Sequence, residues 1–122
     1  MKGYNNYNNI LREARRIGEE RHPDAPAEHH SAFANSVAYA VTGWSGGYGG
    51  PSMREHWASR VVARRFGGSG HCSFNEAVAA LDECCYGPLT LEHALMLECE
   101  HCFDDAPGEV EAARQLLAQA NG

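Results

Sequence analysis

The stretch of residues 71–102 constrains the fold most, because it places all five cysteines between clear helix start and stop signals. Ser73 precedes Glu76 by three residues, which is the spacing of a capping box at a helix start. Apolar residues then recur at helical spacing, until Gly87 and Pro88 end the predicted helix. A second helix should follow, capped by Thr90, with an inner face made of Leu91, Leu95, Cys99 and Cys102. The pattern predicts an antiparallel helical hairpin.

Four more helices are predicted outside this hairpin. The first begins within residues 4–9 and ends before Pro23, the second spans about 25–42, and the third runs from a Ser52 cap to Phe66. The fourth opens near Pro107. Strands are not expected, because β-branched residues are few while Ala, Leu, Glu and Arg are plentiful. The predicted fold is all-α: a single domain over residues 1–122, a compact bundle of about six short helices with glycine-rich connections at 43–51 and 67–70.

Charge is unevenly distributed along the chain, whose net charge is −6. Residues 1–66 hold nine Lys or Arg and six Asp or Glu, giving +3, whereas residues 67–122 hold one arginine and ten acids, giving −9. The chain thus divides into a helical pair (1–42), an arginine-bearing helix between glycine-rich loops (51–66) and an acidic three-helix part (71–122). A concentrated negative charge repels nucleic acid and favours a basic protein surface. The alternative is that these acids only keep a small helical protein soluble.

The predicted contact surface for such a basic partner consists of eight acids in the second half of the chain. They are Glu76, Asp82, Glu83, Glu92, Glu98, Glu100, Asp104 and Asp105.

The cysteines suggest a metal site, provided that the hairpin forms. A turn near Pro88 would bring residues 71 and 72 beside the end of the second helix, and thiolate with imidazole suits tetrahedral zinc. Two alternatives remain: the cysteines act as small buried hydrophobes, or two of them form a disulfide or redox pair. The predicted zinc ligands are Cys72, Cys99, Cys102 and one of His71 or His101.

Common catalytic motifs are absent or out of context. Residues 43–47 match G-x-S-x-G but have no strand or large sheet around them, and no phosphate-binding loop occurs. A helix-turn-helix outline at residues 25–66 has a long glycine-rich connection and sits in an acidic chain, so direct nucleic-acid binding is not expected. We expect neither an enzyme nor a small-molecule substrate. The start lacks a signal-peptide core and no run is long enough to span a bilayer, which predicts a cytoplasmic protein without membrane contact.

By size, acidic charge and lack of a catalytic motif, the chain resembles small acidic inhibitor proteins such as phage anti-CRISPR and anti-restriction proteins or bacterial toxin-immunity proteins. This resemblance implies a non-enzymatic protein without a cofactor that binds and blocks a basic or nucleic-acid-binding protein partner. The alternative is a zinc-stabilised helical regulatory domain that uses the cysteine ligands named above.

Overall fold

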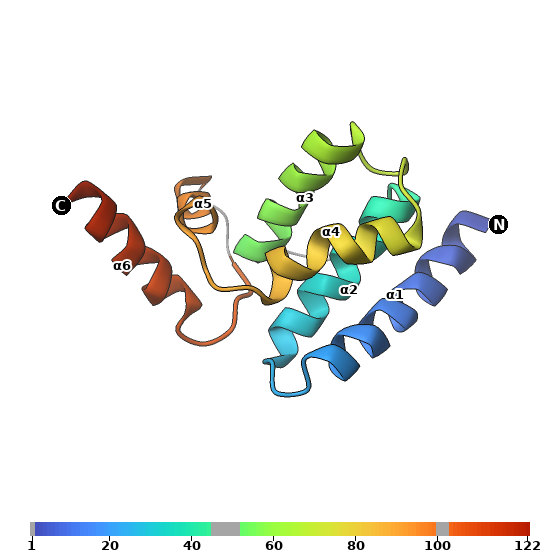
Figure 1. Ribbon diagram of the computed structural model, residues 1–122, viewed down its shortest axis with the longest axis horizontal. Helices are drawn as coiled ribbons and strands as arrows, with labels where there is room; N and C mark the ends of the chain where they lie inside the picture. The colour runs from blue at the N-terminus through green and yellow to red at the C-terminus, as the bar shows by residue number, and fades with distance from the viewer. Residues whose placement is uncertain (1, 45–51, 100–102) are drawn as a thin grey trace.

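The computed structural model describes residues 2–44, 52–99 and 103–122, which contain six α-helices, one 3₁₀ helix and no strand (Figure 1). The predicted all-α fold is therefore confirmed. The first helix begins at residue 2, earlier than predicted, and the last begins two residues after Pro107. The elements are α1 (Lys2–Arg21), α2 (Ala27–Thr42), α3 (Met53–Phe66), α4 (Phe74–Tyr86), α5 (Leu91–Ala94), η1 (Leu95–Cys99) and α6 (Glu109–Asn121).

Local signals in the sequence set most of these boundaries. Ser52 and Ser73 each form a complete capping box at the start of α3 and α4. Gly43 and Gly67 end α2 and α3 with φ values of 81° and 77°, a left-handed conformation that glycine adopts without a steric cost. The predicted starts of α3 and α4 and the predicted ends of α2 and α3 are therefore confirmed.

The prediction for the second helix of the hairpin is wrong. Thr90 does cap a helix, but α5 makes a single turn and continues as the 3₁₀ helix η1. A 3₁₀ helix has three residues per turn, so a face that was assigned at α-helical spacing does not stay in register. Leu91 and Leu95, expected to face inward, are each 42 % exposed. The residues buried in their place are His93, Ala94 and Met96.

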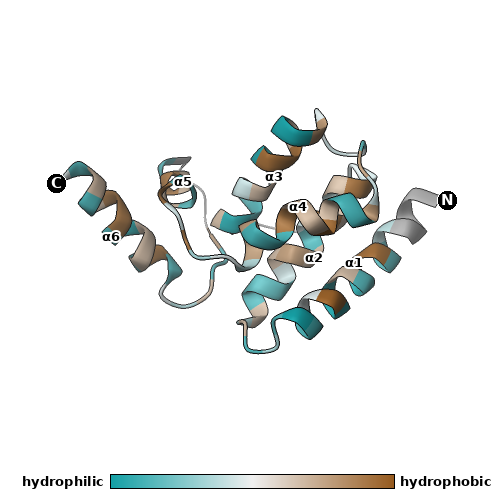
Figure 2. Cartoon of the chain, in the orientation of Figure 1, coloured by the Kyte–Doolittle hydropathy of each residue, from teal (hydrophilic) through white to brown (hydrophobic). Residues whose placement is uncertain are grey.

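The main hydrophobic cluster lies among α1, α2, α3 and α4. Helix α2 is central: it packs along α1 and is also in contact with α3 and α4 (Figure 1). Its Phe33 and Val37 are fully buried, together with Leu81 and Cys85 of α4 and Val62 of α3. Burying a large apolar side chain contributes about 1.5–3 kcal/mol. Figure 2 shows the resulting alternation of hydrophobic and hydrophilic residues along these helices.

A second, smaller cluster holds the C-terminal elements. Ala94, Met96 and Ala113 are buried there around Met53, the first residue of α3. Helix α6 packs on α5 and η1 and lies at the opposite end of the molecule from the start of α1 (Figure 1). Helix α4, which the charge pattern groups with the C-terminal helices, packs with α2 and α3 instead. None of the described helices combines the length and apolar character that a bilayer span requires.

Candidate functional site

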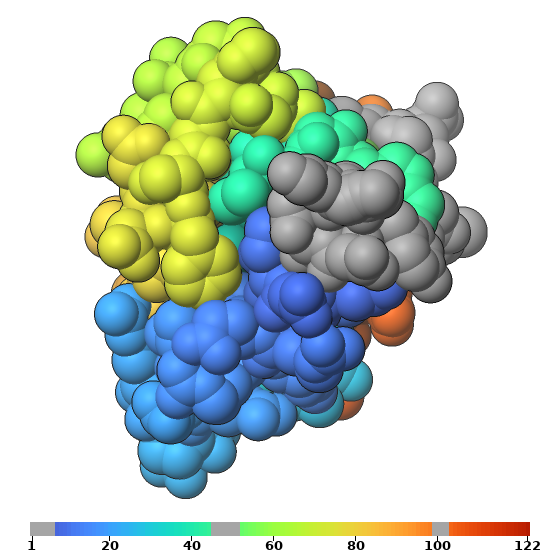
Figure 3. Space-filling model, turned by 90° about the vertical axis from the view of Figure 1, so that its right-hand side faces the viewer, coloured from blue at the N-terminus to red at the C-terminus, as the bar shows by residue number. Residues whose placement is uncertain are grey.

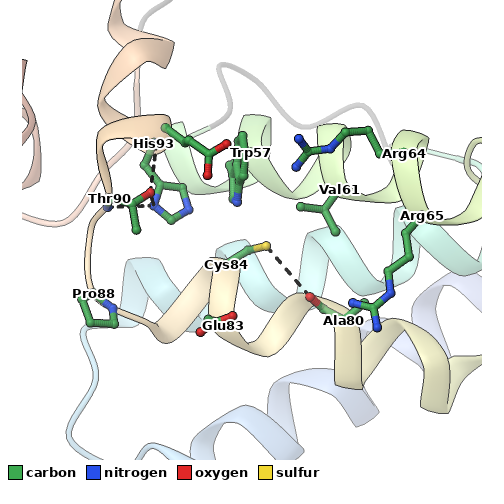
Figure 4. A pocket seen from close by; sticks show the side chains of 11 residues that line it. Trp57, Val61, Arg64, Arg65, Ala80, Glu83, Cys84, Pro88, Thr90 and His93 are labelled. Atoms are coloured by element: carbon green, nitrogen blue, oxygen red, sulfur yellow. Dashed lines mark hydrogen bonds between the residues drawn. The ribbon is translucent and has the colours of Figure 1, made fainter.

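A pocket of about 650 Å³ opens between α3, α4 and α5 (Figure 4). Helix α4 ends before Gly87 and Pro88, where the chain turns away from it. Helix α5 therefore packs against α3 and not against α4, which leaves the pocket between the three helices. The polar residues of its lining come from all three helices and are described below. The apolar part of the lining consists of Trp57, Val61, Ala80, Cys84 and Pro88.

His93 lies at the α5 end of this pocket and is only 2 % exposed. The backbone N–H of Thr90 donates to His93 Nδ1 over 3.2 Å, and the Thr90 hydroxyl lies 3.1 Å from the same nitrogen. A backbone amide can only donate, so Nδ1 accepts and the neutral ring carries its hydrogen on Nε2. Burial, with a contribution from Arg54, lowers the pKa of His93 to about 4, so the ring is neutral at pH 7.

The Nε2–H group of His93 is buried and has no hydrogen-bond partner in the part of the chain that the structure describes. Figure 4 shows the ring beside Thr90, with its second nitrogen turned toward the space between Trp57 and Cys84. The Trp57 ring packs edge-to-face against it at 5.5 Å. A buried polar group left without a partner costs about 1–3 kcal/mol. Such a donor therefore favours a ligand with an acceptor at this point.

The α3 side of the pocket is basic. Arg64 and Arg65 line it, and the Arg64 guanidinium lies 4.7 Å from the centre of the Trp57 ring. Arg60 and Arg64 also line a second pocket of about 360 Å³, which adjoins the first and shares Trp57 with it. None of these three arginines forms an ion pair with another described residue.

The opposite side is acidic and contains three of the predicted partner-binding residues. Glu83 and Glu92 line the larger pocket, and Glu92 and Glu98 line the adjoining one. All three side chains are exposed and form no ion pair within the described residues. We call them the acidic edge.

The other predicted acids are distributed elsewhere. Glu76 accepts the backbone N–H of Ser73 in the cap of α4, and Asp82 lies 2.9 Å from His22 Nε2. Asp105 Oδ1 accepts the backbone N–H of Met53 over 3.0 Å at the start of α3. Asp104 is exposed, and Glu100 lies outside the described residues. Three of these acids thus have partners within the protein.

Sequence reasoning missed the residue that holds the pocket walls together. Arg54 is 4 % exposed, and its Nη1 donates to the carbonyl oxygens of Cys84 at 3.1 Å and Gly87 at 2.7 Å. Its Nε donates to Glu109, the first residue of α6, at 3.0 Å. An arginine in the first turn of a helix is unfavourable because its charge opposes the helix dipole. This position of Arg54 is the sequence feature that could have indicated a contact with another part of the chain.

Glu109 receives a second hydrogen bond from His29 Nε2 of α2, at 2.9 Å. Burial alone would raise the pKa of Glu109, but the hydrogen bonds from His29 and Arg54 outweigh it and lower this pKa to about 2. The carboxylate is therefore charged at all ordinary pH values. The pair of Arg54 and Glu109 links α3, the end of α4 and the start of α6.

Of the predicted zinc ligands, only His71 and Cys72 have side chains that the structure describes. The loop with His71 and Cys72 lies against the end of α2, where Cys72 Sγ contacts the Ala40 carbonyl oxygen at 3.4 Å. Figure 3 shows this loop between α3 and α4 on the face that carries α1, whereas η1 lies toward the α6 end in Figure 1. The hairpin on which the site depended does not form. His101, Cys102 and the side chain of Cys99 lie outside the description, so the zinc site stays a prediction.

The described cysteines are free thiols, and their raised pKa values make them poor nucleophiles. Cys84 lines the pocket, yet burial raises its pKa to about 11, with a contribution from Glu83. Burial also raises the pKa of the fully buried Cys85 thiol and of Cys72. Among the described residues, no three His, Cys, Asp or Glu side chains are grouped as a metal site would require.

Comparison with protein-family models, with curated proteins and with solved structures found no match for this chain.

Proposed function

We propose that this protein is a non-enzymatic binding protein that captures and blocks a basic protein partner, through the acidic edge of the pocket between α3, α4 and α5. The observation that carries the proposal is the position of Glu83, Glu92 and Glu98. These three carboxylates are exposed, lack an ion-pair partner in the described residues and border two adjoining pockets with Trp57 between them. A tryptophan in a concave surface can anchor a partner, and unpaired carboxylates beside it favour a partner of positive charge.

The chemistry of the pocket agrees better with binding than with catalysis. The Nδ1 atom of His93 is already engaged by Thr90, so this ring offers a hydrogen-bond donor and no general base. The Cys84 thiol stays protonated at neutral pH, because its pKa is raised to about 11. The proposed function is that of an inhibitor, as in anti-CRISPR, anti-restriction or toxin-immunity proteins. The acidic protein would cover a basic surface with which its partner binds a nucleic acid.

The experiment compares two double charge reversals with the same total change of charge. Glu83→Lys with Glu92→Lys alters the acidic edge. Asp24→Lys with Glu111→Lys alters two exposed acids that line neither of the two pockets. The tagged wild-type protein captures its partner at about 50 mM salt, mass spectrometry identifies it, and calorimetry measures the affinity of each variant at low and high salt.

The acidic-edge variant should bind the partner at least about tenfold more weakly at low salt, and the difference should shrink as salt screens the charges. The control variant should bind within about threefold of the wild type. Equal affinity of the acidic-edge variant and the control would show that this edge does not contact the partner.

A further inference from the structure

The buried Nε2–H group of His93 has no hydrogen-bond acceptor among the described residues. The pocket in front of it is apolar on the Val61, Ala80 and Cys84 side. Its rim is charged and open to solvent, with carboxylates on α4 and α5 and guanidinium groups on α3. An occupant must therefore combine an acceptor at the His93 end, an apolar body and a polar or charged exterior.

The charges of the rim, together with the proposed function, set the charge of the occupant. The Arg64 guanidinium already lies on the face of Trp57, where the ring's electrons stabilise it. Glu83 and Glu92 have no such contact within the described residues. Arg65 is exposed and has no ion pair there either, so the rim offers charges of both signs. Because the proposed partner is basic, its cationic groups would lie beside the carboxylates.

A segment of polypeptide combines these features. Backbone carbonyl groups supply the acceptor, a leucine-sized side chain supplies the apolar body, and neighbouring lysine or arginine residues reach the rim. We infer that the pocket between α3, α4 and α5 receives an apolar side chain of a basic protein segment, whose adjacent backbone carbonyl accepts the hydrogen bond of His93 Nε2. This inference rests on the proposed function and adds the chemistry of the partner's anchoring residue.

The probes are three capped tripeptides that differ in one feature each. Acetyl-Lys-Leu-Lys-amide has the inferred chemistry, acetyl-Lys-Gly-Lys-amide lacks the apolar anchor, and acetyl-Glu-Leu-Glu-amide has the opposite charge. Binding is followed by NMR through the indole N–H signal of Trp57, which Trp44→Phe distinguishes from that of the other tryptophan. The first peptide should bind saturably with a dissociation constant on the order of millimolar. The other two should bind at least about fivefold more weakly.

Three variants locate the binding. His93→Phe removes the donor and should weaken acetyl-Lys-Leu-Lys-amide about fivefold. Val61→Phe places a larger side chain in the pocket and should abolish saturable binding while leaving His93 intact, so it decides the matter if His93→Phe fails to fold. His71→Phe alters an exposed histidine in the loop between α3 and α4 and should change nothing.

Several results would overturn the inference. These are the absence of a saturable shift of the Trp57 signal up to about 20 mM peptide, equal binding of the glycine or glutamate peptide, and undiminished binding by Val61→Phe. If the peptides fail while the Glu83 and Glu92 reversal still weakens partner binding, the acidic edge contacts the partner without an inserted anchor. If both fail, the proposed function fails as well.

Discussion

Gly18 is the position on α1 where a side chain has no room. A Cβ atom there would overlap the hydroxyl oxygen of Tyr86 and lie 3.2 Å from the Phe33 ring. Tyr86 is itself held in place, because its hydroxyl lies 2.7 Å from His30 Nδ1 and its ring stacks on His22 at 4.0 Å. Gly18 therefore lets α1 approach the end of α4.

Gly18→Ala should lower the free energy of unfolding by about 2 kcal/mol, as overpacking in a core does. This reverses the usual sign, since alanine is better than glycine inside a helix by about 1 kcal/mol. Urea unfolding measures the change. In a Tyr86→Phe background the overlap with the hydroxyl is gone, and the same substitution should cost less. A higher urea midpoint for Gly18→Ala alone would contradict the packing described here.

Asp105 is an acid whose charge destabilises the folded protein. Burial raises its pKa to about 6, although the Met53 N–H bond lowers it, and its Oδ2 atom has no partner in the described residues. Between about pH 4 and 6 the folded protein keeps a proton that the unfolded chain has released, so this residue makes stability fall as pH rises.

Asp105→Asn keeps the acceptor for Met53 and removes the charge. It should raise the free energy of unfolding at pH 7 by roughly 1 kcal/mol and have little effect near pH 4. Urea unfolding at a series of pH values measures this difference. Asp104→Asn, at the exposed neighbouring position, is the matched control and should not change the pH profile. An equal gain in the free energy of unfolding for both variants would show that the burial of Asp105 is not the cause.

At the scale of elements, α6 depends on its first residue. The helix packs on α5 and η1, and Glu109 connects it to α2 and α3 through His29 and Arg54. Removing one partner of a buried ion pair leaves the other charge unpaired, which is more costly than the pair is worth.

Glu109→Gln should lower the free energy of unfolding by about 2–3 kcal/mol at pH 7. The pKa of Glu109 is lowered to about 2, so its stabilisation is complete above about pH 4.5 and is lost as pH falls toward 2. The variant should therefore lose less stability on acidification than the wild type. Glu111→Gln, on an exposed position of α6, is the control.

Hydrogen exchange locates the effect. Amides of α6 should lose protection in Glu109→Gln before those of α1 and α2 do, because α6 packs on α5 and η1 and is linked to α2 through Glu109. Uniform loss of protection over the whole chain would show that α6 unfolds together with the main cluster.

The elements that sequence predicted well are those governed by local chemistry. Ser73 and Glu76 are three residues apart, and their capping box needs no other part of the chain. The extent of α5 depends instead on how residues 91–99 pack on α6 and α3. Leu91 and Leu95 therefore misled the prediction, although their spacing was helical.

The candidate site shows the same division. The charge pattern included Glu83, Glu92 and Glu98 among eight candidates, since the acids of the second half can be read directly from the sequence. His93 and Arg54 were missed as site residues, because their roles arise from contacts with Trp57 and Glu109, which lie 36 and 55 residues away in the sequence.

At the scale of the molecule, the two oppositely charged halves of the chain are not two separate regions in space. The arginines of α3 belong to the positive half, and the acidic edge belongs to the negative half, yet both border one pair of pockets. A partner that binds there meets both signs. The net charge of −6 is a poor description of this surface, whose neighbouring positive and negative edges also favour one orientation of the partner.

The division into two hydrophobic clusters also has a consequence for synthesis on the ribosome. The buried residues of the main cluster extend from Ala14 to Cys85, so they have all been translated before α5 and α6. Domains generally form from the N-terminus as the chain emerges. Helices α1–α4 can thus assemble first, and Glu109 arrives last to complete the ion pair with an Arg54 that already holds the end of α4.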